Sequence, residues 1–163
     1  MKQTYSEGLS MRLTRQTNYA IRILMYCAAN EGRLSRIPDI AQAYSLSDLF
    51  LFKILQPLVE AGFVQTVRGR NGGVKLAKPA EEITLFDVVR VTEESFAMAE
   101  CFESDTECPL VEGCGLNEAL RKALGAFFEV LASYTIQDLI DARPNMRDLL
   151  GLDVQLDRAA API

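Results

Sequence analysis

The spacing of apolar residues from Thr17 to Gly62 predicts three helices. Apolar side chains recur on one helical face between Thr17 and Asn30, as in an amphipathic helix. A second, short helix is expected from Ile37-Pro38-Asp39 to about Tyr44, because proline is tolerated in a first turn. Ser47 is a good N-cap for a third helix, which Gly62 ends. The face of the first helix is Tyr19, Ile23, Tyr26 and Cys27, with Ala20 and Leu24 beside it.

The third predicted helix separates an apolar inner side from a mixed outer side. Pro57 near its end removes a backbone hydrogen bond, which predicts a kink or early fraying. The inner side is Leu51, Ile54, Leu55 and Leu58. The outer side is Ser47, Asp48, Leu49, Phe52, Lys53 and Gln56, with Phe50 at the margin.

A β-hairpin is expected after the third helix. The β-prone runs 63–67 and 73–77 flank the sequence RGRNG, in which Asn71-Gly72 favours a hairpin turn. The order helix, helix, turn, helix, hairpin is typical of a winged helix-turn-helix. The fold class predicted is mainly α with a small β-hairpin wing.

The second half adds two predicted helices. Thr84 is a good N-cap, with Asp87 three residues on as in a capping box, for one that runs to about Glu94. The longest periodic pattern runs from Leu116 to about Ala142, and its apolar stripe is wide enough to predict contact with a second subunit. The segments expected are a disordered N-terminal extension (1–10), a winged helix-turn-helix DNA-binding domain (11–80), a connecting helix and cysteine loop (81–115), a dimerisation helix (116–142), and a flexible C-terminal tail (143–163). This tail has little to bury from Gly151 onward.

Charge is divided unevenly along the chain. The net charge is −5, yet residues 11–78 contain ten Lys or Arg against four Asp or Glu, and residues 79–163 contain six against seventeen. The predicted winged-helix half is therefore basic, which suits a nucleic-acid partner.

In a winged helix-turn-helix the third helix enters the major groove and the wing contacts the backbone or the minor groove. Exposed Leu49 and Phe52 suit thymine methyl groups, although Phe50 and Phe52 could instead pack on the wing or a partner subunit. Arginines on a glycine-rich turn suit narrow, A/T-rich minor grooves. The candidate DNA-binding residues are Thr14, Arg15, Gln16, Ser47, Leu49, Phe50, Phe52, Lys53, Gln56, Arg68, Arg70 and Lys75.

Three of the four cysteines lie in AECFESDTECPLVEGCGLN, residues 99–117, and the chain has no histidine. Cys101, Cys108 and Cys114 are separated by six and five residues, which is looser than a zinc knuckle. Cys27 lies in the apolar face of the first helix, where a buried, inert thiol is expected. From the residues alone, an iron–sulfur cluster, zinc, a thiol redox switch and a structural role all stay open.

Other features narrow the class of protein. The N-terminus lacks the apolar core of a secretory signal, and no apolar run is long enough to span a membrane, so a cytoplasmic protein is expected. RGRNGG is not a phosphate-binding loop, and no general base is evident, which argues against a redox enzyme or electron carrier.

Five stretches together resemble the iron–sulfur winged-helix regulators that include the cluster-assembly regulators of the IscR type and the nitric-oxide sensors of the NsrR type, and most closely the rhizobial iron regulators among them. These stretches are the cysteine segment and MRLTRQTNYAIR, LFLFKILQPL, VRGRNGGVKL and FDVVRVTE. The resemblance covers about residues 11–142. It implies a homodimer with a 4Fe-4S cluster held by Cys101, Cys108 and Cys114, and repression of iron-uptake genes at A/T-rich operators. The same resemblance leaves open a regulator of this fold that senses redox state, nitric oxide or cluster supply.

The fourth cluster ligand of such regulators is missing from its usual places. Asn117 and Asn18 occupy the positions where relatives carry a histidine or a carboxylate, and a carboxamide is a poor iron ligand. Stand-ins are a small exogenous molecule or the side chains of Glu100, Asp105 or Glu107. The hypothesis that follows is that one iron is weakly held, and that its loss lowers affinity for DNA.

Overall fold

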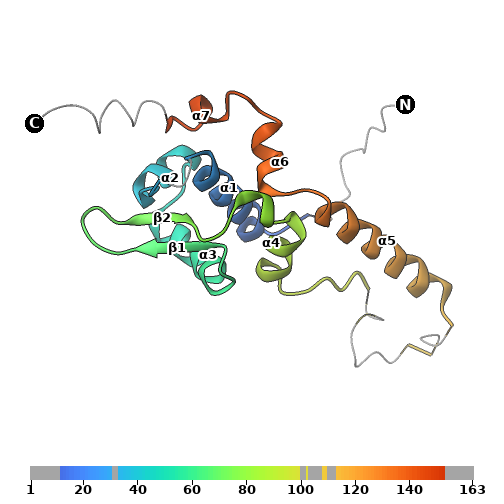
Figure 1. The fold of residues 1–163 in the computed structure, drawn as a ribbon. Helices are drawn as coiled ribbons and strands as arrows, with labels where there is room; N and C mark the ends of the chain where they lie inside the picture. Colours follow the sequence, from blue (N-terminus) through green and yellow to red (C-terminus); the bar gives the residue numbers. More distant parts are fainter. Residues whose placement is uncertain (1–11, 31–32, 100–101, 103–107, 110–112, 153–163) are drawn as a thin grey trace, which may run out of the picture.

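The computed structural model describes residues 12–30, 33–99, 102, 108–109 and 113–152. The predicted extension (1–10) and the last eleven residues lie outside this part of the chain. The elements, shown in Figure 1, are α1 (Arg15–Ala29), α2 (Ile37–Tyr44), α3 (Asp48–Glu60), β1 (Val64–Val67), β2 (Gly73–Leu76), the 3-10 turn η1 (Ala80–Glu82), α4 (Leu85–Thr92), α5 (Gly115–Ala132), α6 (Ile136–Asp141) and α7 (Met146–Leu149). The fold is mainly helical with one two-stranded hairpin, as predicted.

Helix α1 lies at the centre of the core. It packs against α3, α4, α6 and β2, and Ile23, Leu24 and Tyr26 are fully buried on it. Burying an Ile or Leu side chain stabilises a fold by roughly 1.5–3 kcal/mol. The predicted inner face is confirmed, except that Tyr19 is only half-buried.

Helix α3 follows its prediction closely. The Ser47 hydroxyl accepts a hydrogen bond from the Phe50 N–H, and Gly62 adopts the left-handed conformation just beyond the helix. The four predicted inner residues are all buried, and the predicted outer residues are exposed. The helix continues through Pro57 to Glu60, so the early fraying expected there is not seen.

The hairpin pairs Val64 with Leu76 and Val67 with Gly73, which leaves a five-residue loop, 68–72. The turn expected at Asn71-Gly72 is not the one formed. Gly69 takes the left-handed conformation, and the Gly72 N–H donates to its carbonyl oxygen. Several turn-forming residues adjoin in this loop, so the dipeptide alone could not set the register.

The strand β2 has a second neighbour before α2. Ser35 and Val74 exchange two backbone hydrogen bonds, each 2.8 Å long. A Cβ atom on Gly73 would lie 2.5 Å from the Ser35 carbonyl oxygen, so only glycine fits there. The start of α2 is therefore fixed to the hairpin.

A chain of hydroxyl groups, formed by Thr14, Thr17 and Thr92, joins α1 to the end of α4. The Thr92 hydroxyl donates to the Val88 carbonyl, so the Thr17 hydroxyl, 2.8 Å away, must donate to Thr92. The Glu93 carboxylate accepts from the Thr14 N–H at 2.7 Å. The first turn of α1 is thus held by the two residues that end α4. The capping box predicted for Thr84 and Asp87 at the other end of α4 is present.

The long helix predicted over 116–142 is two helices. Helix α5 ends at Ala132, and Thr135 starts α6 with its own capping box to Asp138. The break follows from tertiary pairing, because the Leu85 N–H donates to the Tyr134 carbonyl and the Ile136 N–H donates to the Ile83 carbonyl. Figure 1 shows α6 returning to α1 while α5 extends away from the winged-helix body.

The tail buries more than predicted. Leu152 is only 1 % exposed, and Met146 and Leu150 pack against the core. The Arg147 guanidinium donates to the Ala29 carbonyl at the end of α1. Within the described ranges, none of the helices combines the length and the apolar character needed to cross a bilayer.

Candidate DNA-binding surface and cysteine segment

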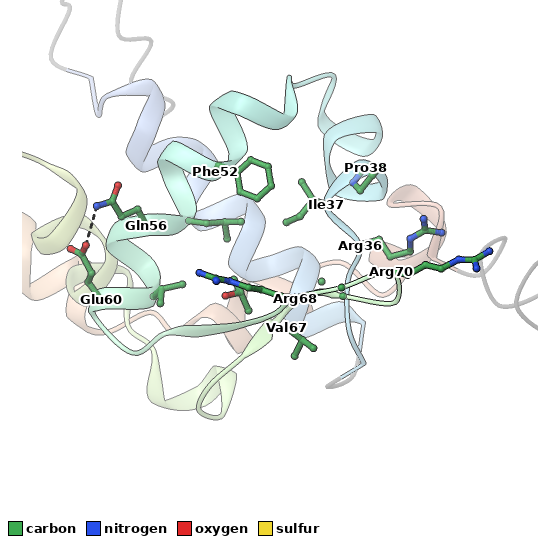
Figure 2. A pocket seen from close by; sticks show the side chains of 15 residues that line it. Arg36, Ile37, Pro38, Phe52, Gln56, Glu60, Val67, Arg68 and Arg70 are labelled. Atoms are coloured by element: carbon green, nitrogen blue, oxygen red, sulfur yellow. Dashed lines mark hydrogen bonds between the residues drawn. The ribbon is translucent and has the colours of Figure 1, made fainter.

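A groove of about 660 Å³ lies between α3 and the hairpin. Its lining comes from three segments, namely the start of α2, the outer side of α3 and the loop and flanks of the hairpin. Figure 2 shows Phe52 and Ile37 in the groove, with three arginines around it. These arginines are Arg36, Arg68 and Arg70. An apolar floor edged by guanidinium groups matches a surface that receives a polyanion.

The outer side of α3 presents the predicted residues to solvent. Leu49 is 82 % exposed and Phe52 is 58 % exposed, which is unusual for such large apolar side chains. Lys53 is exposed one position further on. Gln56 is already engaged, since its amide donates to the Glu60 carboxylate at 3.1 Å.

Phe50 packs against α1 and does not line the groove beside the wing. Its ring meets that of Tyr19 edge-to-face, with 5.9 Å between centroids. The Arg15 guanidinium lies 5.7 Å from the Phe50 centroid and 5.9 Å from that of Tyr19. The start of α1 and the start of α3 therefore form one continuous surface with Arg15 on it.

The other residues predicted to contact DNA do not line the groove. Thr14 is the N-cap of α1, and its hydroxyl accepts from the Thr17 N–H. Gln16 is half-buried. Lys75 pairs with Gln65 within the hairpin and does not line the groove. Behind it, the Lys78 ammonium lies over the ring of Phe63 at 4.9 Å.

Sequence reasoning missed Arg36. It lies at the N-cap position of α2, and nothing in the local pattern marks it. The pairing of Ser35 with Val74 carries this arginine to the groove, beside the hairpin. Only that non-local pairing could have revealed it.

Two of the three clustered cysteines are described, and both Cys108 and Cys114 are half-buried. Cys114 is the N-cap residue of α5. Cys101 and the candidate ligands Glu100, Asp105 and Glu107 lie outside the described residues. Cys27 is fully buried, as predicted, and burial raises the pKa of its thiol to about 12, which makes it a poor nucleophile and ligand.

Asn117 is buried at the start of α5 and is already engaged. Its side-chain oxygen accepts a hydrogen bond from the Arg121 Nε at 2.6 Å. The Arg121 guanidinium also lies 4.9 Å from the ring centroid of Phe102, within the cysteine segment. Asn18 is exposed on α1. Arg121 thus spans the two ends of the cysteine segment.

The helix-turn-helix, the arginine-edged wing and the projecting helix α5 define a DNA-binding transcriptional regulator of the winged-helix class. The chain belongs to the Rrf2 family of iron-dependent transcriptional regulators, which it matches over residues 13–142. Rrf2 proteins are DNA-binding regulators rather than enzymes, and they generally act as dimers.

Individual relatives agree with this assignment. The chain is 72 % identical to the protein aau3 of Rhizobium meliloti (strain 1021), over 88 % of this chain and 94 % of that one. It is 43 % identical to the HTH-type transcriptional regulator NsrR of Bacillus licheniformis, over 86 % and 100 %. The solved structure of CymR, the global cysteine regulator of B. subtilis, superposes with a TM-score of 0.68 at 28 % identity, covering 81 % of this chain and 98 % of that one.

Proposed function

We propose that this protein is an iron-responsive repressor of iron-uptake genes that binds DNA as a cytoplasmic homodimer while it carries an iron–sulfur cluster. The observation that carries the proposal is the place of the cysteine segment, which connects α4 to α5. Helix α4 holds the first turn of α1 through the hydroxyl chain, and α5 is the projecting helix. A change in this segment therefore has a direct route to the DNA-binding surface.

The donor set fits a cluster. Cysteine thiolates are the ligands that iron–sulfur clusters take, and a 4Fe-4S cluster would be held by Cys101, Cys108 and Cys114. The half-buried positions of Cys108 and Cys114 give limited solvent access, which suits a group that must respond to small molecules. When bound, the cluster supplies a sensor that iron limitation or oxygen can degrade.

The same residues give a reason for sensitivity. Asn117, where relatives have a ligand, uses its oxygen to accept from Arg121. The fourth iron would then depend on a carboxylate of the cysteine segment or on a small exogenous molecule. A weakly held iron is the first to leave when iron is scarce, and DNA affinity falls with it.

Dimerisation would place two winged helices on one duplex. Two recognition helices on adjacent half-sites are about 34–36 Å apart, one helical turn of DNA. We assign this spacing to pairing through α5, and the preference for A/T-rich operators to the wing arginine Arg68, because narrow minor grooves attract arginine.

The test combines metal analysis with DNA binding. Protein purified without oxygen should be brown and contain iron and labile sulfide. A mobility-shift assay at fixed salt should show operator binding that is lost when a chelator removes the cluster. Colourless, zinc-containing protein, or binding indifferent to cluster loss, would contradict the proposal.

A second candidate is a regulator of the same fold that senses nitric oxide, redox state or cluster supply. It is favoured by the 43 % identity to NsrR across the whole of that protein. Measuring which treatment first releases DNA (iron chelation, oxygen or nitric oxide) separates the two. A third, a DNA-binding adaptor with zinc on the cysteines, would be colourless and would contain zinc in place of iron and labile sulfide.

A further inference from the structure

We propose that Arg36 is a DNA-contacting residue which, together with Arg70, holds one backbone phosphate at the mouth of the groove. The inference rests on the proposed placement of DNA between α3 and the hairpin. To the predicted DNA contacts, which lie at the start of α1, on α3 and on the wing, it adds one from the N-cap position of α2.

The position of Arg36 suits a phosphate better than a base. It is exposed, lines the groove and makes no side-chain cap bond to α2. Figure 2 shows Arg36 and Arg70 projecting in the same direction, away from α3, whereas Arg68 reaches back toward α3. Base edges are read by residues on the recognition helix, so groups beyond its reach meet the sugar–phosphate backbone.

The charge distribution favours an anion at the end of the groove where Arg36 and Arg70 lie. Among the residues that the structure describes, no ion pair joins Arg36 or Arg70 to a carboxylate. The one carboxylate lining the groove, that of Glu60, lies on α3 and accepts from Gln56. Asp39 in the first turn of α2 disfavours an anion on the helix axis, so the guanidinium groups supply the attraction.

The backbone beneath Arg36 is preorganised. Its neighbour Ser35 is bonded to Val74 in both directions at 2.8 Å, and Gly73 packs too closely on Ser35 for a side chain to intervene. Arg36 therefore keeps its place relative to the hairpin before DNA arrives. Contacts made from such a fixed position lose little entropy on binding.

The experiment compares Arg36→Gln with Arg33→Gln. Arg33 is an exposed arginine on the same connecting segment that does not line the groove. Cluster-loaded dimer is titrated with a duplex that the wild-type protein selects from a random-sequence pool, at several salt concentrations. Each phosphate contact contributes about 0.9 to the slope of log K against log salt. Arg36→Gln should lower affinity roughly tenfold and reduce this slope by about one, while Arg33→Gln leaves both unchanged.

Neutral methylphosphonate linkages locate the contact. One linkage, at symmetric positions in the two half-sites, should weaken binding by the wild-type protein more than binding by Arg36→Gln, in which Arg70 alone still contacts that phosphate. Arg36→Lys should recover most of the salt slope, since it restores the positive charge.

Two results would overturn the role of Arg36 alone. One is an affinity loss in Arg36→Gln with an unchanged salt slope and a lower melting temperature, which assigns it to folding. The other is a changed base preference with an unchanged slope, which assigns it to base readout. Failure of the wild-type protein to select any duplex would instead overturn the proposed function, and this inference with it.

Discussion

At the residue scale, variants of Asn117 separate two explanations of the lability that we propose for the cluster. Asn117→His offers a ligand at the start of α5, whereas Asn117→Ala only removes the acceptor that Arg121 uses. We expect the histidine variant to lose its cluster more slowly to a chelator, and the alanine variant to lose it at least as fast as the wild type. The decay of visible absorption after adding the chelator measures both.

Equal decay rates in the wild-type and histidine proteins would show that the fourth position does not control cluster loss. A slower rate in both variants would assign the effect to Arg121 instead, because both remove its bond to the amide oxygen.

Cys27 gives a pH-dependent prediction. Burial raises the pKa of its thiol from 9.0 to about 12. Above pH 9 the unfolded chain loses this proton while the folded chain keeps it, so stability is complete below pH 9 and falls between pH 9 and 12. Each pKa unit corresponds to about 1.4 kcal/mol.

Urea unfolding of the wild type and of Cys27→Ala across that range measures the contribution. The free energy of unfolding should fall more steeply with pH in the wild type. Burial also raises the pKa of Tyr44, but this residue is present in both proteins and so does not account for a difference between them. Parallel pH profiles would contradict the assignment to Cys27.

At this scale the sequence was informative where chemistry is local. The apolar face that contains Cys27, the inner side of α3 and the caps at Ser47 and Thr84 are set by residues within a few positions of one another. Arg36 and the bond between Asn117 and Arg121 were not foreseen. The position of Arg36 depends on pairing of the preceding residue with Val74, which lies thirty-eight residues after Arg36. The bond between Asn117 and Arg121 depends on the rotamers that the two side chains adopt in the folded protein.

At the element scale, the hydroxyl chain between α1 and α4 predicts a stability cost. Thr92→Val keeps the shape of the side chain but leaves the buried Thr17 hydroxyl without its acceptor. An unsatisfied buried donor costs about 1–3 kcal/mol. We expect a loss of about 2 kcal/mol in the free energy of unfolding, measured by urea denaturation.

The matched control is Thr66→Val, which changes an exposed hydroxyl on β1. Its effect should stay within about 0.5 kcal/mol. If Thr92→Val changed the free energy of unfolding as little as Thr66→Val, the hydroxyl chain would not hold α1 to α4. The proposed effect of the cysteine segment on the DNA-binding surface would then have to pass through other contacts.

Two element boundaries could not be predicted from the sequence for the same physical reason. The apolar period runs on without interruption through Ser133 and Thr135, yet pairing of Tyr134 and Ile136 with the segment before α4 breaks the helix. In the hairpin, pairing with the segment before α2 helps fix the register. Backbone partners distant in sequence decided the first boundary, and they act together with the choice among several turn-forming residues at the second.

At the scale of the whole molecule, α5 presents an apolar stripe away from its own core. Leu116 is 63 % exposed and Val130 is 57 % exposed, and between them the stripe continues through Leu120, Ala123 and Phe127. The inner side of the same helix packs Phe128 against Phe86 and Phe96. Because Rrf2 regulators generally act as dimers, we assign this outer stripe to the second subunit.

Introducing a charge into the stripe tests this assignment. Val130→Asp and Leu116→Asp should shift the protein toward monomer in sedimentation analysis, because burying an unpaired carboxylate is costly. Operator affinity should fall with dimer content. The control is Lys122→Asp, which alters the charged side of α5 where Lys122 pairs with Glu118. Dimers that persist in both stripe variants would place the subunit contact elsewhere.

The bonds between Ser35 and Val74 have a consequence for the choice among operators. These bonds fix the hairpin to the segment that begins α2, and α2 in turn packs against the recognition helix α3. The wing and the recognition helix therefore cannot adjust their separation to suit each duplex. The energetic cost of fit then falls on the nucleic acid, through bending and changes in groove width. Promoters with identical contacted bases but stiffer intervening steps should be bound less well, so flexibility of the untouched base pairs would rank the genes that this regulator controls.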